Sequence, residues 1–232
     1  EAEFKQLAAQ GYNRIPVTLE TFADLDTPLS IYLKLADRAW TYLLESVQGG
    51  ERFGRYSFIG LPAELRFEVR GHLCSEYRGN TLLSQSEQPD PLEWVRESHA
   101  RFKAPAIPGL PRFAGGLVGY FGYETVRYVE KRVAECDKPD AIGAPDILLM
   151  LSDRLAVVDN LSGKLYLVVY ADPRGEGAYA EAQMQLSVLL QALRQPITMP
   201  AEMPAQPVAA QSEFSEDAFI EAVERAKRYV YD

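Results

Sequence analysis

The chain has 232 residues, of which 47% are hydrophobic and 25% are charged, and these values are ordinary for a globular protein that buries a substantial core. Its formal net charge of -9 argues against a surface for nucleic acid or anionic membrane, because such surfaces need clustered Lys and Arg to neutralise phosphates. No apolar run approaches the roughly 18 residues that span a bilayer.

The cysteines and histidines do not form a metal-binding pattern. Cys74 and Cys136 lie far apart in the sequence, and neither has ligand spacing with His72 or His99. A zinc site needs more ligands than this pattern supplies. We therefore expect no zinc site, and the low cysteine count fits a protein of the reducing cytoplasm.

The first part of the chain alternates between helical and extended patterns. Apolar residues at helical spacing predict a short helix over residues 3–10, which Gly11 ends. Residues 15–19 read as a strand, and Pro16 places it at a sheet edge because proline cannot donate to the ladder. Thr27-Pro28 predicts the start of the next helix, with a hydroxyl N-cap before a proline at the first helical position.

Two strand-like segments, residues 40–47 and 54–61, carry most of the functional interpretation. The first is apolar on both faces, which predicts a core strand covered on both sides that ends in two polar residues, Glu45 and Ser46. A buried carboxylate needs a cation or several N–H donors, because an unpaired buried charge is costly.

The cation that would pair with Glu45 has two possible sources. Arg52 and Arg55 lie close by in the sequence, across a glycine-containing turn. A small ligand with an ammonium group is the other source. The residues alone favour a partner within the protein, because most polar residues at strand ends serve turns and neighbouring side chains.

The next segments predict a hairpin sheet and a covering helix. Residues 63–69 alternate as a half-exposed antiparallel strand, with Leu65, Phe67 and Val69 inward and Glu64, Arg66 and Glu68 outward. Residues 74–78 and 81–83 predict a hairpin through Gly79-Asn80. A helix is predicted over residues 91–102, where His99 is interpreted as a packing or hydrogen-bonded residue.

A glycine-rich segment, residues 113–123, has the glycine density of a phosphate loop. It lacks the Gly-Lys-Ser/Thr ending of that loop, and it also lacks the strand and acid of a dinucleotide-binding motif. Glycines among large aromatic residues in a strand mark a bend or the close approach of another backbone. We therefore favour the structural interpretation.

The remainder of the chain predicts three strands and three helices. A short helix over residues 124–131 would pack Tyr128 inward, and a long helix follows over residues 176–194. The predicted strands, rich in β-branched and aromatic residues, cover residues 147–151, 155–159 and 164–170. Residues 195–211 contain four prolines and predict a linker.

The last predicted helix follows the linker and runs to Asp232 without a stop signal. We expect it to be the first element of a following domain, so that the chain is a fragment. The predicted organisation is a domain over residues 1–194, a linker over 195–211 and this helix over 212–232.

The motifs quoted above resemble the N-terminal portion of anthranilate synthase component I. The resemblance rests on Leu43-Leu44-Glu45-Ser46, on the segment 54–60 and on the glycine-rich segment 115–124, and the stretches 11–16 and 29–35 look like the bacterial members. The resemblance covers essentially the whole chain, and the matching segments occur in the same order as in the family. Together with the number of strands, it implies an α+β fold of two stacked antiparallel sheets, an orthogonal sandwich, with helices packed outside.

The resemblance also implies a regulatory site. In the family, the Leu-Leu-Glu-Ser segment forms part of the pocket where L-tryptophan binds as feedback inhibitor, and a Pro-Tyr-Met segment of the catalytic domain completes it. Carried over to this sequence, the leading candidate is the serine, and the full set of candidates is Ser46, Glu45, Leu44, Arg55, Tyr56 and Ser57.

The family converts chorismate and ammonia, which a glutaminase subunit delivers, into anthranilate and pyruvate with Mg²⁺. Its metal ligands and catalytic histidine belong to the C-terminal domain, so the resemblance implies no catalytic residue and no metal ligand in this chain, which we expect to be inactive alone. The complete protein would be a cytoplasmic hetero-oligomeric enzyme. Two alternatives stay open: para-aminobenzoate synthase component I, and a non-catalytic amino-acid-binding or docking module.

Overall fold

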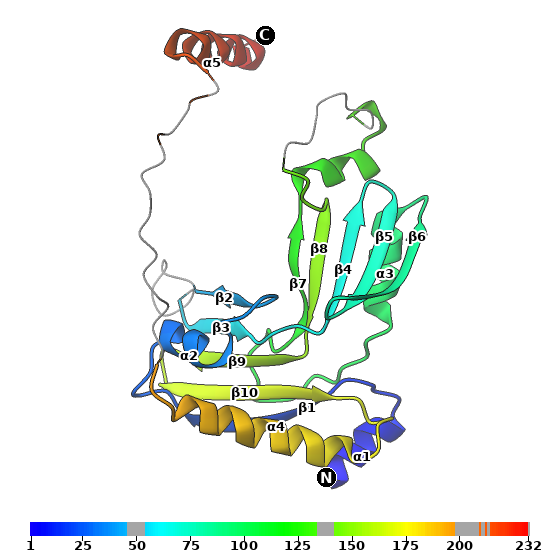
Figure 1. Cartoon of the computed structure of the whole chain (residues 1–232), viewed down its shortest axis with the longest axis vertical. Helices are drawn as coiled ribbons and strands as arrows, with labels where there is room; N and C mark the ends of the chain where they lie inside the picture. Colours follow the sequence, from blue (N-terminus) through cyan, green and yellow to red (C-terminus); the bar gives the residue numbers. More distant parts are fainter. Residues whose placement is uncertain (46–53, 134–141, 198–208, 210–211, 213, 232) are drawn as a thin grey trace. The chain divides into compact units, whose positions relative to one another are not determined.

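The computed structural model describes residues 1–45, 54–133, 142–197, 209, 212 and 214–231 (Figure 1). The chain divides into two compact units, residues 1–198 and 199–232. Within the described residues, none of the helices has the length and apolar character that a membrane crossing requires.

The first unit contains two five-stranded sheets in which every neighbouring pair is antiparallel. The sheet that we call sheet A has the order β1 (Ile15–Phe22), β10 (Lys164–Ala171), β9 (Arg154–Asp159), β3 (Tyr56–Gly60) and β2 (Tyr42–Leu44). Sheet B has the order β6 (Thr81–Glu87), β5 (Leu73–Arg78), β4 (Leu65–Arg70), β8 (Ile147–Ser152) and β7 (Gly116–Phe121). The predicted α+β class with two antiparallel sheets is confirmed.

All of sheet B lies between two strands of sheet A in the sequence. The chain leaves β3 at Gly60 and returns to sheet A at Arg154, where β9 pairs with β3. Leu61 donates its N–H to the carbonyl of Arg154 at 3.0 Å, so the points of exit and return are bonded to each other. In Figure 1 the strands of sheet A run across the view and those of sheet B run up it.

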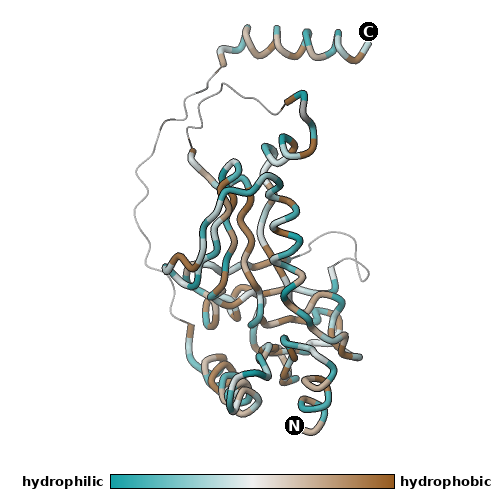
Figure 2. Tube along the Cα trace, turned by 90° about the vertical axis from the view of Figure 1, so that its right-hand side faces the viewer, coloured by the Kyte–Doolittle hydropathy of each residue, from teal (hydrophilic) through white to brown (hydrophobic). Residues whose placement is uncertain are grey.

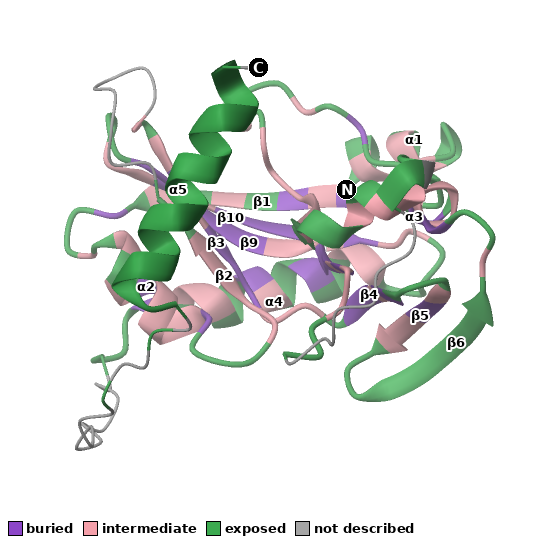
Figure 3. Cartoon of the chain, turned by 90° about the horizontal axis from the view of Figure 1, so that it is seen from above, coloured by how far each residue is buried: buried purple, intermediate pink, exposed green. Residues whose placement is uncertain are grey.

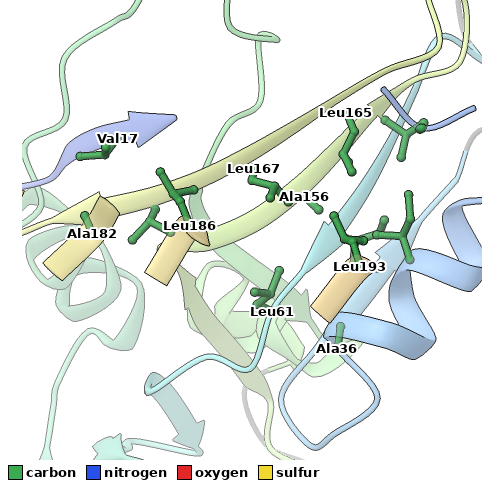
Figure 4. Close-up of a cluster of buried hydrophobic side chains, with 14 of the residues drawn as sticks. Val17, Ala36, Leu61, Ala156, Leu165, Leu167, Ala182, Leu186 and Leu193 are labelled. Atoms are coloured by element: carbon green, nitrogen blue, oxygen red, sulfur yellow. The ribbon is translucent and has the colours of Figure 1, made fainter. Parts of the chain in front are cut away.

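Helices α1 (Ala2–Ala9), α2 (Pro28–Leu35) and α4 (Ala178–Leu193) pack against sheet A. The core beneath them joins apolar residues of β1, β9 and β10 to Ile31 of α2 and Leu186 of α4 (Figure 4). Helix α2 begins with the predicted cap, since Thr27 Oγ1 accepts from the Ser30 N–H at 3.1 Å and Ser30 Oγ accepts from the Thr27 N–H at 3.0 Å. The predicted edge position of the Pro16 strand is also confirmed.

Helix α3 (Pro91–Ala100) packs against sheet B. Phe67 is buried beneath it, with ring centroids 5.8 Å from Trp94 and 6.4 Å from Phe102. Two 3-10 helices, η2 (Tyr123–Tyr128) and η3 (Lys131–Val133), follow β7. Tyr128 packs inward as predicted, and its hydroxyl donates to the Gly71 carbonyl at 2.7 Å. His99 was predicted to be a packing or hydrogen-bonded residue; it is exposed, and its ring makes no hydrogen bond with the described residues, so this prediction is wrong.

The outward face of β4 is less exposed than its alternating pattern predicts. Arg66 is 8% exposed, and its guanidinium carbon lies 4.2 Å from the ring centre of Trp40 and 4.3 Å from that of Tyr77. Its Nε also donates to Glu68 at 3.0 Å. The prediction of an exposed outward Arg66 is therefore wrong, because two aromatic rings from distant parts of the sequence cover this charge.

The glycine-rich segment has the structural role that was predicted. A Cβ on Gly119 would lie 1.9 Å from the carbonyl oxygen of Leu148 in β8, far inside van der Waals contact. The two strand backbones can approach this closely only because residue 119 has no side chain.

Helix α5 (Glu216–Tyr231) belongs to the second unit and follows the predicted pattern. Figure 2 shows hydrophobic and hydrophilic residues alternating along it, and Figure 3 shows that it is exposed along its length. The predicted domain boundaries after residues 194 and 211 stay predictions.

Candidate functional site

The strand that carries Leu44 and Glu45 is a short edge strand, not the core strand predicted from residues 40–47. β2 has only three residues, pairs with β3 alone, and leaves Leu44 48% exposed and Glu45 exposed. Trp40 has a φ of 64°, which interrupts the extended backbone before the strand begins. The leading candidate, Ser46, lies outside the described residues.

Tyr42 attaches this edge strand to both sheets. Its ring lies against Gly60, the residue directly opposite it in β3. Its hydroxyl forms a hydrogen bond with Oγ of Ser152, the last residue of β8, at an O···O distance of 2.6 Å. Burial raises the pKa of Tyr42 to about 12, above the ordinary tyrosine value of about 10.

Leu44 shares one face of sheet A with aromatic residues of β3. It is directly opposite Phe58, and Tyr56 lies on the same face because alternate residues of a strand point the same way. The Phe58 ring contacts Phe113 edge-on at 5.2 Å between centroids and lies 6.1 Å from Tyr56. Leu44, Tyr56 and Phe58 form what we call the aromatic face.

Arg55, a predicted partner of Glu45, pairs with a residue that the sequence did not single out. Its Nη2 lies 2.8 Å from Oδ2 of Asp159, and its Nε donates to both carboxylate oxygens at 3.1 and 3.2 Å. The Asp159 side chain is 2% exposed. The Arg55 guanidinium, together with N–H donors of the following turn, holds the pKa of Asp159 at about 2 despite the opposing effect of burial.

Because Arg55 pairs with Asp159, it does not pair with Glu45. Glu45 makes no hydrogen bond or ion pair with any residue that the structure describes, whereas Arg52 lies outside that part of the chain. Arg55 also covers the Tyr56 ring, with its guanidinium carbon 4.9 Å from the ring centre. Of the two partners predicted within the protein, Arg55 is therefore wrong for Glu45, and pairing with Arg52 stays a prediction.

Ser57 differs from the other described candidates because it points to the opposite face of β3. It is 1% exposed, and Asn160 donates to its hydroxyl at 3.1 Å. The structure thus brings Leu44 and Tyr56 together on the aromatic face but separates Ser57 from them. No local sequence signal indicates that Asp159 pairs with Arg55 or that Asn160 bonds to Ser57.

The described residues offer no cluster for a metal ion: among them, no three His, Cys, Asp or Glu side chains gather closely enough to bind one. They therefore do not fit the Mg²⁺ that the resemblance implies for the complete enzyme.

Comparison with known proteins identifies the family. A sequence model of the family described as chorismate binding enzyme matches residues 42–232. The chain belongs to this family. The match includes β2, the aromatic face and both sheets except for β1.

Relatives in the chorismate binding enzyme family extend the match over nearly the whole chain. Anthranilate synthase component 1 of Pseudomonas aeruginosa is 52% identical over 98% of the chain and 47% of that protein. The proteins of the same name from Neisseria meningitidis and Acetivibrio thermocellus are 51% and 32% identical, over 99% and 98% of the chain. The chain spans about half the length of the relatives it matches. The predicted resemblance to anthranilate synthase component I is confirmed.

A solved structure supports the fold. The crystal structure of anthranilate synthase component I from Streptococcus pneumoniae superposes with a TM-score of 0.55, at 21% identity, over 90% of this chain and 44% of that one. At this identity, the likeness concerns the arrangement of the strands and helices and not the residues of a site.

Proposed function

We propose that this chain is the tryptophan-sensing part of anthranilate synthase component I. The complete enzyme would convert chorismate and ammonia, supplied from glutamine by a glutaminase subunit, into anthranilate and pyruvate in the cytoplasm, with Mg²⁺ bound by residues outside the described chain. The observation that carries the proposal is the 52% identity to an anthranilate synthase component 1 over 98% of the chain. By itself, the chain is proposed to be inactive.

The arrangement around β2 supports an amino-acid inhibitor. The exposed side of Leu44 and the ring of Tyr56 offer apolar walls for an indole. Glu45 has no partner among the described residues, and in this proposal its carboxylate accepts the ammonium group.

Arg55 can bind a carboxylate while it stays paired with Asp159. The Asp159 bonds use Nε and Nη2, and Nη1 makes no hydrogen bond with the described part of the chain. In this proposal Ser46 contacts the ligand directly, as in the family, whereas Ser57 acts indirectly through its bond to Asn160.

Feedback inhibition of the complete enzyme tests the site. Anthranilate fluorescence is followed with chorismate, glutamine and the glutaminase subunit while tryptophan is titrated. For Glu45→Gln and Ser46→Phe we expect the half-inhibiting tryptophan concentration to rise at least about tenfold, the equivalent of one lost charged or well-packed contact. Glu3→Gln, an exposed acid on α1, is the matched control and should behave as wild type.

Two results would contradict the proposal. Normal inhibition of both variants would remove β2 from the tryptophan site. Formation of para-aminobenzoate in place of anthranilate would change the identity of the enzyme. Separately, anthranilate production by residues 1–232 alone would disprove the inactivity of this chain.

A further inference from the structure

A second candidate site lies where the end of β8 meets β10 and the end of α3. It is a cavity of about 260 Å³ whose lining includes Arg14, His99, Phe102, Asp153 and Tyr170. None of the five described candidates for tryptophan, Leu44, Glu45, Arg55, Tyr56 and Ser57, lines it. The cavity is therefore distinct from the aromatic face.

Arg14 supplies a positive charge to the cavity with part of its hydrogen-bonding capacity unused. Its Nη1 donates to the Asn13 carbonyl at 2.7 Å and to Oδ2 of Asp172 at 3.1 Å. Nε and Nη2 make no hydrogen bond within the described part of the chain. The side chain is only 19% exposed, and its guanidinium carbon lies 5.1 Å from the ring centre of Phe102, which holds the group in place.

Asp153 supplies the opposite charge and is also unsatisfied. The nearest cationic nitrogen is Nε of Arg154 at 4.0 Å, which is beyond hydrogen-bonding distance. No other described residue donates a hydrogen bond to its carboxylate. Burial raises the pKa of Asp153. The positive charges of Arg154 and Arg14 oppose this effect, although Arg14 forms no ion pair with Asp153. The Asp153 side chain is 30% exposed, and its carboxylate, which has no side-chain donor among the described residues, can accept a hydrogen bond from a ligand in the cavity.

The remaining walls are mainly apolar. Phe102 and Leu151 line the cavity together with the half-buried ring of Tyr170. The Tyr170 hydroxyl makes no hydrogen bond with the described residues, and neither does the His99 ring, so both can serve a ligand. Gly115 approaches Tyr170 so closely that a Cβ there would lie 2.6 Å from the ring.

We propose that this cavity binds a free α-amino acid, with the ammonium group on Asp153 and the carboxylate on Arg14. An α-amino acid carries both charges on adjacent carbons, so it can satisfy both side chains at once. The volume of 260 Å³ lies below the range of about 300–1,000 Å³ typical of pockets for drug-sized ligands, which favours a molecule of amino-acid size. The apolar walls select an apolar side chain.

Calorimetric titration of the 232-residue chain tests this site with L-leucine and two analogues. Isoamylamine keeps the ammonium and the branched side chain of leucine, and isocaproate keeps the carboxylate and the same side chain. We expect L-leucine to bind and each analogue to bind at least about tenfold more weakly, because each lacks the charged group that either Asp153 or Arg14 would bind. This comparison uses only the wild-type chain, so it does not depend on the folding of a variant.

Substitutions then locate the site. Asp153→Asn and Arg14→Gln should each weaken L-leucine binding at least about tenfold. Glu97→Gln, an exposed acid on α3, makes the same acid-to-amide change outside the cavity and should bind as wild type. Circular dichroism confirms that each variant is folded.

The proposal is overturned if L-leucine fails to bind, or if isoamylamine or isocaproate binds as tightly as L-leucine. It is also overturned if Asp153→Asn leaves binding unchanged while Glu45→Gln abolishes it, because leucine would then occupy the proposed tryptophan site. The proposed function does not depend on these outcomes, since it is tested through inhibition by tryptophan.

Discussion

The ring of Tyr42 occupies the space where a side chain of Gly60 would be. A Cβ on Gly60 would lie 1.9 Å from Cε1 of Tyr42, and the two residues are directly opposite in the β2–β3 pair. Tyr42 therefore stabilises the three-residue edge strand in two ways. Its ring packs in the space that Gly60 leaves open, and its hydroxyl forms a hydrogen bond with Ser152.

Gly60→Ala should destabilise the first unit. The added methyl displaces the Tyr42 ring and weakens its bond to Ser152, and overpacking of this kind costs about 1–3 kcal/mol of unfolding free energy. Urea unfolding measures the loss. Gly175→Ala is the matched control, because its Cβ would meet the nearest atom at an ordinary 3.5 Å. Equal stabilities of the two variants would contradict the packing of Tyr42 on Gly60.

Asp159→Asn should change how stability depends on pH. The pKa of Asp159 is about 2 in the folded chain and about 3.9 in an unfolded one. Because the folded value is lower, the ionised carboxylate stabilises the fold above about pH 4, and this contribution is lost as the pH falls through about 2. Thermal unfolding should therefore show wild type above Asp159→Asn at pH 7, with the gap closing toward pH 2. A gap that stays constant over this range would contradict the Arg55–Asp159 pairing.

Arg66→Met should be costly although arginine is a surface residue in most proteins. The change removes the cation between Trp40 and Tyr77 and leaves the Glu68 carboxylate without its donor. We expect a loss of about 2 kcal/mol or more in unfolding free energy. Arg78→Met, at the exposed end of β5, makes the same substitution and should stay within about 0.5 kcal/mol of wild type. A comparable loss in both variants would mean that the aromatic cover contributes nothing.

Gly119→Ala should separate the structural and ligand-binding interpretations of the glycine-rich segment. Its Cβ would clash with the Leu148 carbonyl at 1.9 Å, whereas a Cβ on Gly122 would meet the Asp146 carbonyl at 3.1 Å. We expect a loss of about 2 kcal/mol or more for Gly119→Ala and a clearly smaller one for Gly122→Ala, measured by chemical denaturation. The opposite order would contradict the β7–β8 register.

Local sequence patterns were sufficient to predict most helices and strands, but they did not predict which strands pair with one another. The Thr27-Pro28 cap and the hairpin at Gly79-Asn80 depend on neighbouring residues, and both were predicted. The edge position of β2 could not be predicted, because it depends on which strand pairs with β3. Apolar residues on both faces of residues 40–47 indicate burial. They do not indicate whether sheet or irregular backbone buries them.

The candidate site shows the same limit. Resemblance named Arg55 and Tyr56, but the partner of Arg55 is Asp159, at the far end of a strand that follows all of sheet B. Arg14 and Asp153 are also far apart in sequence and were not singled out as site residues. Their shared cavity arises where the two sheets meet, and no local pattern indicates that the two residues come together.

The bond between Leu61 and Arg154 has a consequence for the order of folding. Pairing of β3 with β9 closes a loop that contains all of residues 62–153, and the entropy lost on closure grows with the length of flexible chain. Sheet B is built entirely from that loop, with the local hairpin β5–β6 at one edge. Once sheet B forms, the flexible length is reduced to a few residues at each end. Early formation of sheet B would therefore speed the completion of sheet A, and a mutation in β4 or β8 would slow the folding of a sheet with which neither strand pairs.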